Sequence, residues 1–397
     1  MPELRPGPWL RLTALFAALA TLLAVISGAA SLGAAHRVLA ALALPPLLAL
    51  VTAALLAHRR LLVPALAALV LFGIAALVTA RGLHLALAAV AFAATLVAAV
   101  ATYRGEAAAP RSSWRDYVTL TKPRIMSLLL VTGLCAMFVG AKGTPSAWLV
   151  VVTMSGLALA CGGASALNHV LDRDIDKLMG QRTRARPLAA ERMPPARALE
   201  FGLTLSAFSF VLLASLVNVL AAALALVGNL FYVLVYTRWL KRTTPQNIVI
   251  GGAAGAVPPL VGWAAATGNL TLPALWLFLI VFLWTPPHFW ALALLIRRDY
   301  EAARIPMLPV VRGERETTRQ IVIYSLVLGG ATLVPVLWGT LGLVYLGAAI
   351  VLGATFLWLA LVLRRQTTPR HASVLFHYSL LYLALLFVAM AVDPLIQ

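Results

Sequence analysis

Thirteen long apolar runs divide the chain, and they constrain its fold more than any other feature. Each is about 20 residues long, the length that an α-helix needs to cross a bilayer. They start near Leu10, Val38, Leu61, His84, Ile125, Trp148, Arg197, Leu220, Asn247, Leu272, Gln320, Gly342 and Ser373. Hydrophobic residues make up 62% of the chain and charged residues only 11%, which is more apolar surface than a soluble core can hide. The runs therefore predict an all-α polytopic membrane protein. The first run, about Leu10 to Ala30, exceeds the length of a signal-peptide core and is predicted to be a retained span.

The distribution of basic residues predicts how these spans are oriented. If the N-terminus lies in the cytoplasm and the spans alternate, the outer loops contain only Arg37, Arg81 and Lys142 of the 31 Lys and Arg residues. Such a bias towards cytoplasmic loops is typical of membrane proteins. We therefore expect a multi-pass protein of the cell membrane, with its N-terminus and charged loops in the cytoplasm and its C-terminus outside. The net charge of +18 is explained by topology, so no nucleic-acid partner is expected.

One polar stretch interrupts the apolar pattern. Residues 103–116 (YRGEAAAPRSSWRD) contain Gly, Pro and Ser, a composition typical of linkers. The sequence thus predicts a four-span unit over residues 1–105, a linker over residues 106–116 and a nine-span unit over residues 117–397.

A first polar cluster follows the sixth run. Asn168, Asp172 and Asp176 are spaced i, i+4, i+8, which places them on one face of a helix. Oxygen ligands on one face suit a hard cation such as Mg²⁺. A basic loop with Arg182 and Arg186 follows directly. Acidic and basic groups together at the mouth of a membrane helix indicate a metal-bound anionic substrate, most simply a diphosphate.

Further polar groups are predicted to lie on the same membrane face. At the end of the tenth run, Asp299 is a candidate metal ligand and Arg298 a candidate phosphate contact. Lys122 and Arg124 lie directly before the fifth run and are either cytoplasmic anchors or contacts to the diphosphate. After the eighth run, Lys241 is a further candidate contact. The remaining polar candidates at this face, which would contact the acceptor, are Asn247 and Tyr300.

The tenth run contains Trp-Thr-Pro-Pro-His-Phe-Trp, residues 284–290. Two prolines remove backbone hydrogen bonds and predict a kink or cavity there. A histidine within a membrane span is costly and is therefore a functional candidate. Three roles for His288 stay open: positioning an acceptor, binding a haem iron, or hydrogen bonding to a carbonyl that the prolines leave free.

Together these motifs resemble the UbiA-type intramembrane prenyltransferases and, within them, the protoheme IX farnesyltransferase (haem O synthase) family. The matching segments are LTKPR (120–124), NHVLDRDID (168–176), RTRARPL (182–188), NIVIGGAAG (247–255), WTPPHFW (284–290) and DYEAARIPMLP (299–309). Ala303 stands where many superfamily members have the second Asp of a D-x-x-x-D motif, as the haem O synthase pattern does.

The resemblance implies a nine-helix bundle with a lateral lipid opening and Mg²⁺-dependent transfer of farnesyl from farnesyl diphosphate to the 2-vinyl group of haem B. It implies Asn168, Asp172, Asp176 and Asp299 as catalytic residues, the three aspartates as metal ligands, and His288 as an acceptor contact. Membrane lipid is a further expected partner, as are haem A synthase or cytochrome oxidase assembly factors.

The N-terminal unit lies outside that resemblance and is similar to one half of a haem A synthase. His36 and His84 each open a span at the outer face, so they are predicted to lie at one level, where two imidazoles can bind a haem. The other interpretation is two interfacial histidines beside ordinary Ala-rich packing.

Three other functions each explain part of the sequence. A prenyltransferase for another acceptor, such as an aromatic acid or quinone precursor, keeps Asn168 and both aspartates but gives no reason for the His288 motif. A transporter explains the spans but not two acid–base loops on one face. A phosphatidyl-alcohol transferase also uses spaced Asp with Mg²⁺, but its D-G-x-x-A-R motif is absent from the sequence.

Overall fold

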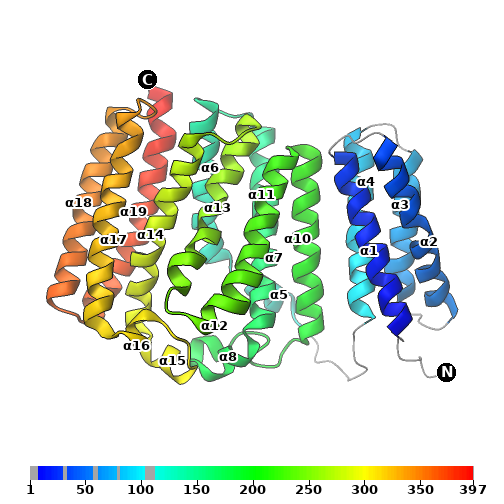
Figure 1. Cartoon of the computed structure of the whole chain (residues 1–397), viewed down its shortest axis with the longest axis horizontal. Coiled ribbons are helices and arrows are strands. Elements are labelled where there is room, and N and C mark those ends of the chain that lie inside the picture. The colour runs from blue at the N-terminus through cyan, green and yellow to red at the C-terminus, as the bar shows by residue number, and fades with distance from the viewer. Residues whose placement is uncertain (1–7, 30–33, 57–60, 78–80, 103–111, 397) are drawn as a thin grey trace.

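The computed structural model describes residues 8–29, 34–56, 61–77, 81–102 and 112–396 (Figure 1). Throughout these ranges the regular structure is helical, without strands. Eleven of the described helices are long and apolar enough to cross a membrane, and two shorter apolar helices, Leu62–Ala76 and Val90–Ala99, lie at the third and fourth predicted positions. The prediction of an all-α polytopic membrane protein is therefore confirmed. Large apolar side chains such as Leu337 and Leu343 are more than 80% exposed on the outer surface, as expected for groups that face lipid.

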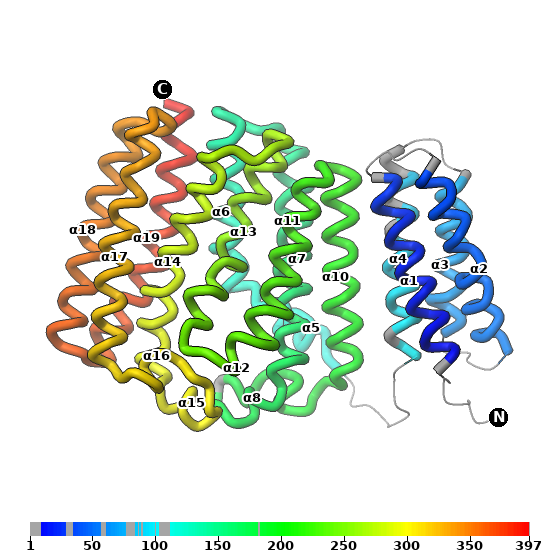
Figure 2. The backbone as a smooth tube through the Cα atoms, in the orientation of Figure 1, coloured from blue at the N-terminus to red at the C-terminus, as the bar shows by residue number. Residues whose placement is uncertain are grey.

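Four helices form the N-terminal unit (Figure 2). They are α1 (Pro8–Ala29), α2 (Ala34–Leu56), α3 (Leu62–Leu77) and α4 (Arg81–Ala101). Each packs against its neighbours in sequence, and α4 also packs against α1, which closes the unit. Most of the predicted linker, up to residue 111, lies outside the described residues.

The second unit begins with a short helix and then runs through nine spans. Its helices are α5 (Trp114–Thr121), α6 (Pro123–Ala141), α7 (Ala147–Leu171), α8 (Arg173–Leu178), α9 (Gln181–Arg184), α10 (Pro195–Leu216), α11 (Val219–Leu230), the π-helix η2 (Phe231–Leu240), α12 (Lys241–Thr243), α13 (Asn247–Thr267), α14 (Leu272–Leu295), α15 (Arg297–Ala302), α16 (Leu308–Val311), α17 (Gly313–Leu337), α18 (Leu343–Arg365) and α19 (Pro369–Ile396). The last helix packs against α6 and α14, so the end of the chain returns to the start of the bundle.

Local sequence explains where several helices begin and end. Ser113 caps α5 in a capping box with Asp116, and Ser146 caps α7, each satisfying free backbone N–H groups. Gly268, with φ of 74°, ends α13 in the left-handed conformation that glycine adopts at low cost. The run predicted near Gln320 instead starts at Gly313, because its first two turns are charged and extend beyond the apolar segment.

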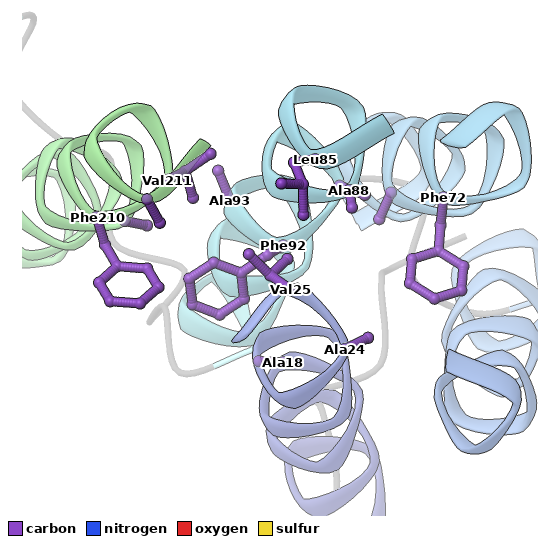
Figure 3. Packing of buried hydrophobic residues seen from close by; sticks show 14 of the residues in the cluster. Ala18, Ala24, Val25, Phe72, Leu85, Ala88, Phe92, Ala93, Phe210 and Val211 are labelled. Atoms are coloured by element: carbon purple, nitrogen blue, oxygen red, sulfur yellow. The ribbon is translucent and has the colours of Figure 1, made fainter. Parts of the chain in front are cut away.

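The two units are joined by a direct apolar contact between α4 and α10. Figure 3 shows Phe92 and Ala93 of α4 beside Phe210 and Val211 of α10. All four side chains are buried and belong to one hydrophobic cluster that spans both units. Between membrane-spanning helices such a contact is stabilised by close packing of side chains rather than by exclusion of water.

Candidate active site

Polar side chains from four parts of the second unit meet at one end of the bundle. The short helices α8, α12, α15 and α16 gather there, at the face where α1 begins and opposite the end of α19 (Figure 1). The end of α7 leads into α8, η2 leads into α12, and the junction of α5 and α6 lies beside them. The segments predicted to carry the chemistry are thus brought to one face.

Asn168, Asp172 and Asp176 lie on a nearly continuous helix that is interrupted at Asp172. The amide of Asp172 donates to the carbonyl of Asn168 at 2.9 Å, and that of Asp176 donates to the carbonyl of Asp172 at 2.8 Å. The helical hydrogen-bond pattern therefore continues from α7 into α8. All three side chains are buried, so they share an inward-facing side, as their spacing requires.

A hydrogen-bond network joins these residues to two lysines. Asn168 Oδ1 accepts from Lys122 Nζ at 2.8 Å, and Asn168 Nδ2 donates to Asp172 Oδ2 at 2.8 Å and to Thr237 Oγ1 at 3.1 Å. Asp172 Oδ2 also accepts from Lys241 Nζ at 2.5 Å. The Lys241 and Asp172 side chains are 10% and 1% exposed. Charge-assisted hydrogen bonds of this kind are strong when water is excluded.

Asp176 is paired with a different cation. Its carboxylate oxygens lie 2.8 and 3.0 Å from Arg186 Nη1. Burial raises the pKa of Asp176, and the Arg186 guanidinium opposes this shift. Lys122, Lys241 and Arg186 thus gather around the two carboxylates. Lys241 and Arg186 pair with the two carboxylates, and Lys122 adds a third basic group that can contact an anionic substrate.

Lys122 reaches this network because of its backbone conformation. It connects α5 and α6 with φ of 49° and ψ of 58°, a left-handed conformation uncommon for residues with a Cβ atom. Pro123 follows at the first position of α6. The pKa of Lys122 is lowered to about 7, chiefly by burial and then by the nearby charges of Arg186 and Lys241, while Asp172 opposes the shift. Strained backbone of this kind costs about 1–3 kcal/mol and is concentrated at functional sites.

Asp174 faces away from this network. Its carboxylate forms two hydrogen bonds of 2.8 Å with Arg242, and the two side chains are 61% and 35% exposed. The hydrogen bonds from Arg242 lower the pKa of Asp174 to about 2. Asp174 is therefore an exposed aspartate, in contrast to the buried Asp172 and Asp176.

Thr237 is a site residue that the sequence analysis did not identify. It lies in η2 and donates to the carbonyl of Tyr232 at 2.9 Å while it accepts from Asn168. Thr237 and Lys241 are four residues apart at the end of an apolar run. This spacing places both on one side of a helix and could have indicated from the sequence that Thr237 belongs to the site. π-Helical turns often occur at functional sites, and this one directs both side chains towards α7.

The donor set fits a hard divalent cation. Asp172 Oδ1 is buried and has no hydrogen-bond partner among the described residues, so one carboxylate oxygen is available. In the part of the chain that the structure describes, no group of three or more His, Cys, Asp or Glu side chains forms a cage by itself. Mg²⁺ is usually held by one or two carboxylates together with substrate phosphates and water. Of the four oxygens of Asp172 and Asp176, only Asp172 Oδ1 lacks a partner among the described residues, because both oxygens of Asp176 contact Arg186.

Asp299 approaches this region but does not form a three-carboxylate group with the other two aspartates. A Cβ atom added to Gly180 would collide with the Asp299 carboxylate, so the carboxylate packs directly on the backbone that follows α8. Tyr300 is adjacent. Burial raises the pKa of Tyr300 to about 12, with Asp172 and Asp299 adding to the shift and Arg186 opposing it. A neutral Tyr300 hydroxyl therefore lies within reach of these charges.

The other predicted contact residues differ in whether they are exposed or buried. Arg124 and Arg298 are exposed, and no hydrogen bond joins either to the network in the described parts of the chain. The side chain of Arg182 lies outside the described residues. Asn247 is fully buried at the start of α13, where Nδ2 donates to the Thr244 carbonyl at 2.7 Å and Oδ1 has no partner among the described residues.

His288 lies within the bundle, about 10 Å along α14 from the C-terminal end of that helix, given seven further residues at 1.5 Å each. Its ring stacks between Trp284 and Phe376, with centroids 4.4 and 4.8 Å away. His288 Nδ1 lies 2.6 Å from Ser379 Oγ. The partner of His288 is therefore a hydroxyl group on α19. One of the three predicted roles was a hydrogen bond to a carbonyl that the prolines leave free, and this contact is a different one.

His36 and His84 lie at the opposite face, near the starts of α2 and α4. Their rings meet edge to face with centroids 5.5 Å apart, so they do lie at one level. His36 Nδ1 lies 3.0 Å from the Ala24 carbonyl, and His84 Nδ1 lies 2.6 Å from the Ala75 carbonyl. Haem binding by this pair stays a prediction.

Comparison with known proteins identifies relatives of the second unit. The UbiA prenyltransferase family profile matches residues 129–387. The chain is 56% identical over 281 residues to a protoheme IX farnesyltransferase of Symbiobacterium thermophilum, covering 70% of this chain and 94% of that one. It is 47% identical over 374 residues to a protoheme IX farnesyltransferase of Chloroflexus aurantiacus, covering 91% of this chain and 63% of that one. The longer alignment extends into the N-terminal unit.

Solved structures show the same fold for the nine-span unit. A digeranylgeranylglyceryl phosphate synthase has a TM-score of 0.60 at 16% identity, covering 71% of this chain and 99% of that one. A UbiA homolog from Archaeoglobus fulgidus, bound to GPP and Mg²⁺, has a TM-score of 0.51 at 17% identity, covering 69% and 99%. The chain therefore belongs to the UbiA prenyltransferase family.

Proposed function

We propose that this prenyltransferase is a protoheme IX farnesyltransferase, which transfers farnesyl from farnesyl diphosphate to the 2-vinyl group of haem B and yields haem O. The observation that carries the proposal is the 56% identity to the Symbiobacterium enzyme of that name, over almost its whole length. The three basic groups beside Asp172 and Asp176, which are Lys122, Lys241 and Arg186, support a diphosphate substrate. The predicted interaction with haem A synthase or oxidase assembly factors stays a prediction.

In the proposed reaction, the bond between farnesyl C1 and the diphosphate oxygen breaks, and its electron pair leaves with the diphosphate. The allylic cation forms a bond to the terminal carbon of the vinyl group. Water then adds to the inner vinyl carbon and loses a proton, which gives a hydroxyl group. The reaction therefore needs no oxidant or reductant.

The site residues have separate roles in this scheme. Lys122, Lys241 and Arg186 stabilise the negative charge that develops on the departing oxygens, an effect that is large where water is excluded. Asn168 links Lys122 to Asp172 and keeps both oriented. The apolar helices around the site shield the allylic cation from early capture by water.

Asp172 and Asp176 would hold Mg²⁺, with Asp299 as the third predicted ligand. When bound, the metal neutralises the diphosphate and makes it a better leaving group. The proposal is supported by the free carboxylate oxygen of Asp172 and by the Archaeoglobus homolog, which is bound to GPP and Mg²⁺. The bias of Lys and Arg towards this face supports a cytoplasmic site.

The direct test is incubation of the purified protein with haem B, farnesyl diphosphate and Mg²⁺, with products identified by mass. We expect haem heavier by one farnesyl group and one hydroxyl group, and no product after chelation of the metal. Parallel reactions with an aromatic acid in place of haem test the main alternative acceptor. Prenylation of the aromatic acid with haem left unchanged would refute the proposal.

A further inference from the structure

The hydroxyl of Ser379 makes two short contacts inside the bundle. Ser379 Oγ lies 2.6 Å from the carbonyl oxygen of Phe376, one turn earlier in α19, and 2.6 Å from Nδ1 of His288 in α14. Ser379 is fully buried and His288 is 6% exposed. The contacts therefore form in a water-poor interior, where their geometry determines which atoms carry protons.

A serine hydroxyl has one proton to donate and two lone pairs that accept. The Phe376 carbonyl can only accept, so the Ser379 proton is directed to that carbonyl. Ser379 Oγ then accepts from His288, which requires a proton on Nδ1. A neutral imidazole carries one proton, so Nε2 is left with a free lone pair. Ser379 thus selects one of the two tautomers of His288.

The surrounding contacts hold both partners in this arrangement. Trp284 Nε1 donates to the Ser379 carbonyl at 2.8 Å, which ties the backbone of α19 to α14. Trp284 and Phe376 stack on the two sides of the imidazole, so the ring cannot easily turn. Among the described residues, Nδ1 is the only nitrogen of His288 with a hydrogen-bond partner.

We propose that Ser379 is a positioning residue, which fixes His288 in the Nδ1–H tautomer so that Nε2 serves as a ligand for the iron of the acceptor haem. This inference rests on the proposed function, because it takes haem as the acceptor. Metal-bound histidines are usually oriented in this way, by a hydrogen bond from the other ring nitrogen. The location of His288, about 10 Å along α14 from the diphosphate end, separates iron binding from the reacting vinyl group.

The test is a double-mutant cycle read out by haem binding. Haem B is titrated into wild type, Ser379→Ala, His288→Ala and the double variant, and binding is followed optically without farnesyl diphosphate. Loss of an outer hydrogen bond to a metal ligand typically weakens binding 10- to 100-fold. We expect the haem Kd to rise at least about 10-fold in Ser379→Ala and the iron-ligand band to shift, whereas Ser379→Ala should have no further effect once His288 is replaced.

Ser325→Ala is the matched control, because Ser325 is also buried but bonds only to the Ile321 carbonyl of its own helix, at 2.7 Å. It should leave haem binding unchanged. An unchanged haem Kd in Ser379→Ala would overturn the proposal. So would an equal weakening in the presence and absence of His288, because that result indicates a general packing effect.

The same preparations separate this inference from the proposed function. If the wild-type protein binds haem but transfers no farnesyl to it, the proposed function alone is refuted. The double-mutant cycle then still tests whether Ser379 sets the tautomer of His288. Normal farnesyl transfer in Ser379→Ala together with an unchanged haem Kd refutes the positioning role alone. The KM for farnesyl diphosphate should stay within about twofold of wild type in Ser379→Ala, since the diphosphate site lies at the end of the bundle.

Discussion

Replacement of Asp172 by asparagine tests the centre of the polar network. The substitution keeps the shape of the side chain but removes the charge that lies 2.5 Å from Lys241 Nζ. Removing one partner of a buried ion pair costs about 3–5 kcal/mol of unfolding free energy, because the other charge stays buried. We expect a loss of stability of about 3–5 kcal/mol.

Activity should fall independently of stability, because Asp172 is also a predicted metal ligand. We expect farnesyl transfer by Asp172→Asn to drop at least 100-fold, equivalent to about 2.7 kcal/mol in the barrier. Transfer is measured as haem O formed per minute at saturating Mg²⁺, and stability by thermal unfolding in detergent. Asp172→Asn/Lys241→Met should recover most of the stability, because no unpaired charge is left buried, but it should not recover activity.

Asp174→Asn is the matched control for this experiment. It makes the same chemical change two residues away, at a pair whose side chains are 61% and 35% exposed. Exposed pairs are worth only about 0.2–1 kcal/mol, so stability and turnover should stay close to wild type. Asp172→Asn with turnover within twofold of wild type, or Asp174→Asn with an equal loss, would refute the reasoning.

Three further predictions follow from the structure. Thr237→Val removes one of the two acceptors of the Asn168 amide, so kcat/KM should fall roughly 5- to 100-fold with little change in unfolding temperature; equal activity would show that Thr237 is not needed. Gly252→Ala should destabilise the protein by about 1–3 kcal/mol, because its Cβ would lie 2.8 Å from a side chain of α14, whereas Gly255→Ala meets no atom within 4 Å and should be neutral; thermal unfolding of the pair checks this, and equal midpoints would contradict it. His36→Ala should remove any haem band of the purified protein that arises from the N-terminal unit while farnesyl transfer continues, and an unchanged spectrum would exclude haem binding by that histidine.

The apolar runs were sufficient to predict the helices, because a membrane span needs both length and hydrophobicity and either is easily read from sequence. The runs predicted near Asn247 and Leu272 begin at those residues. The inward-facing side shared by Asn168 and Asp176 also followed from local spacing. The boundaries between α11, η2 and α12 could not be predicted from hydrophobicity alone, because these three helices form one continuous apolar span, Val219–Thr243.

Long-range partners could not be predicted in the same way. Nothing in the local sequence indicates that Asp172 pairs with Lys241, 69 residues later, or that His288 meets Ser379, 91 residues later. Such pairs depend on which helices pack together. Arg124 shows the opposite limit: it lies in a matching motif, yet its position in the first turn of α6 leaves it exposed.

The contact between α4 and α10 limits how the substrates reach the enzyme. A C15 isoprenoid and a haem are both membrane-soluble, so they are expected to diffuse in from the side. Phe92 and Phe210 are buried where α4 packs on α10, so α4 covers this part of the surface of α10. The apolar substrates are therefore expected to enter the bundle between other helices. The four N-terminal spans would then restrict the side from which substrates can enter.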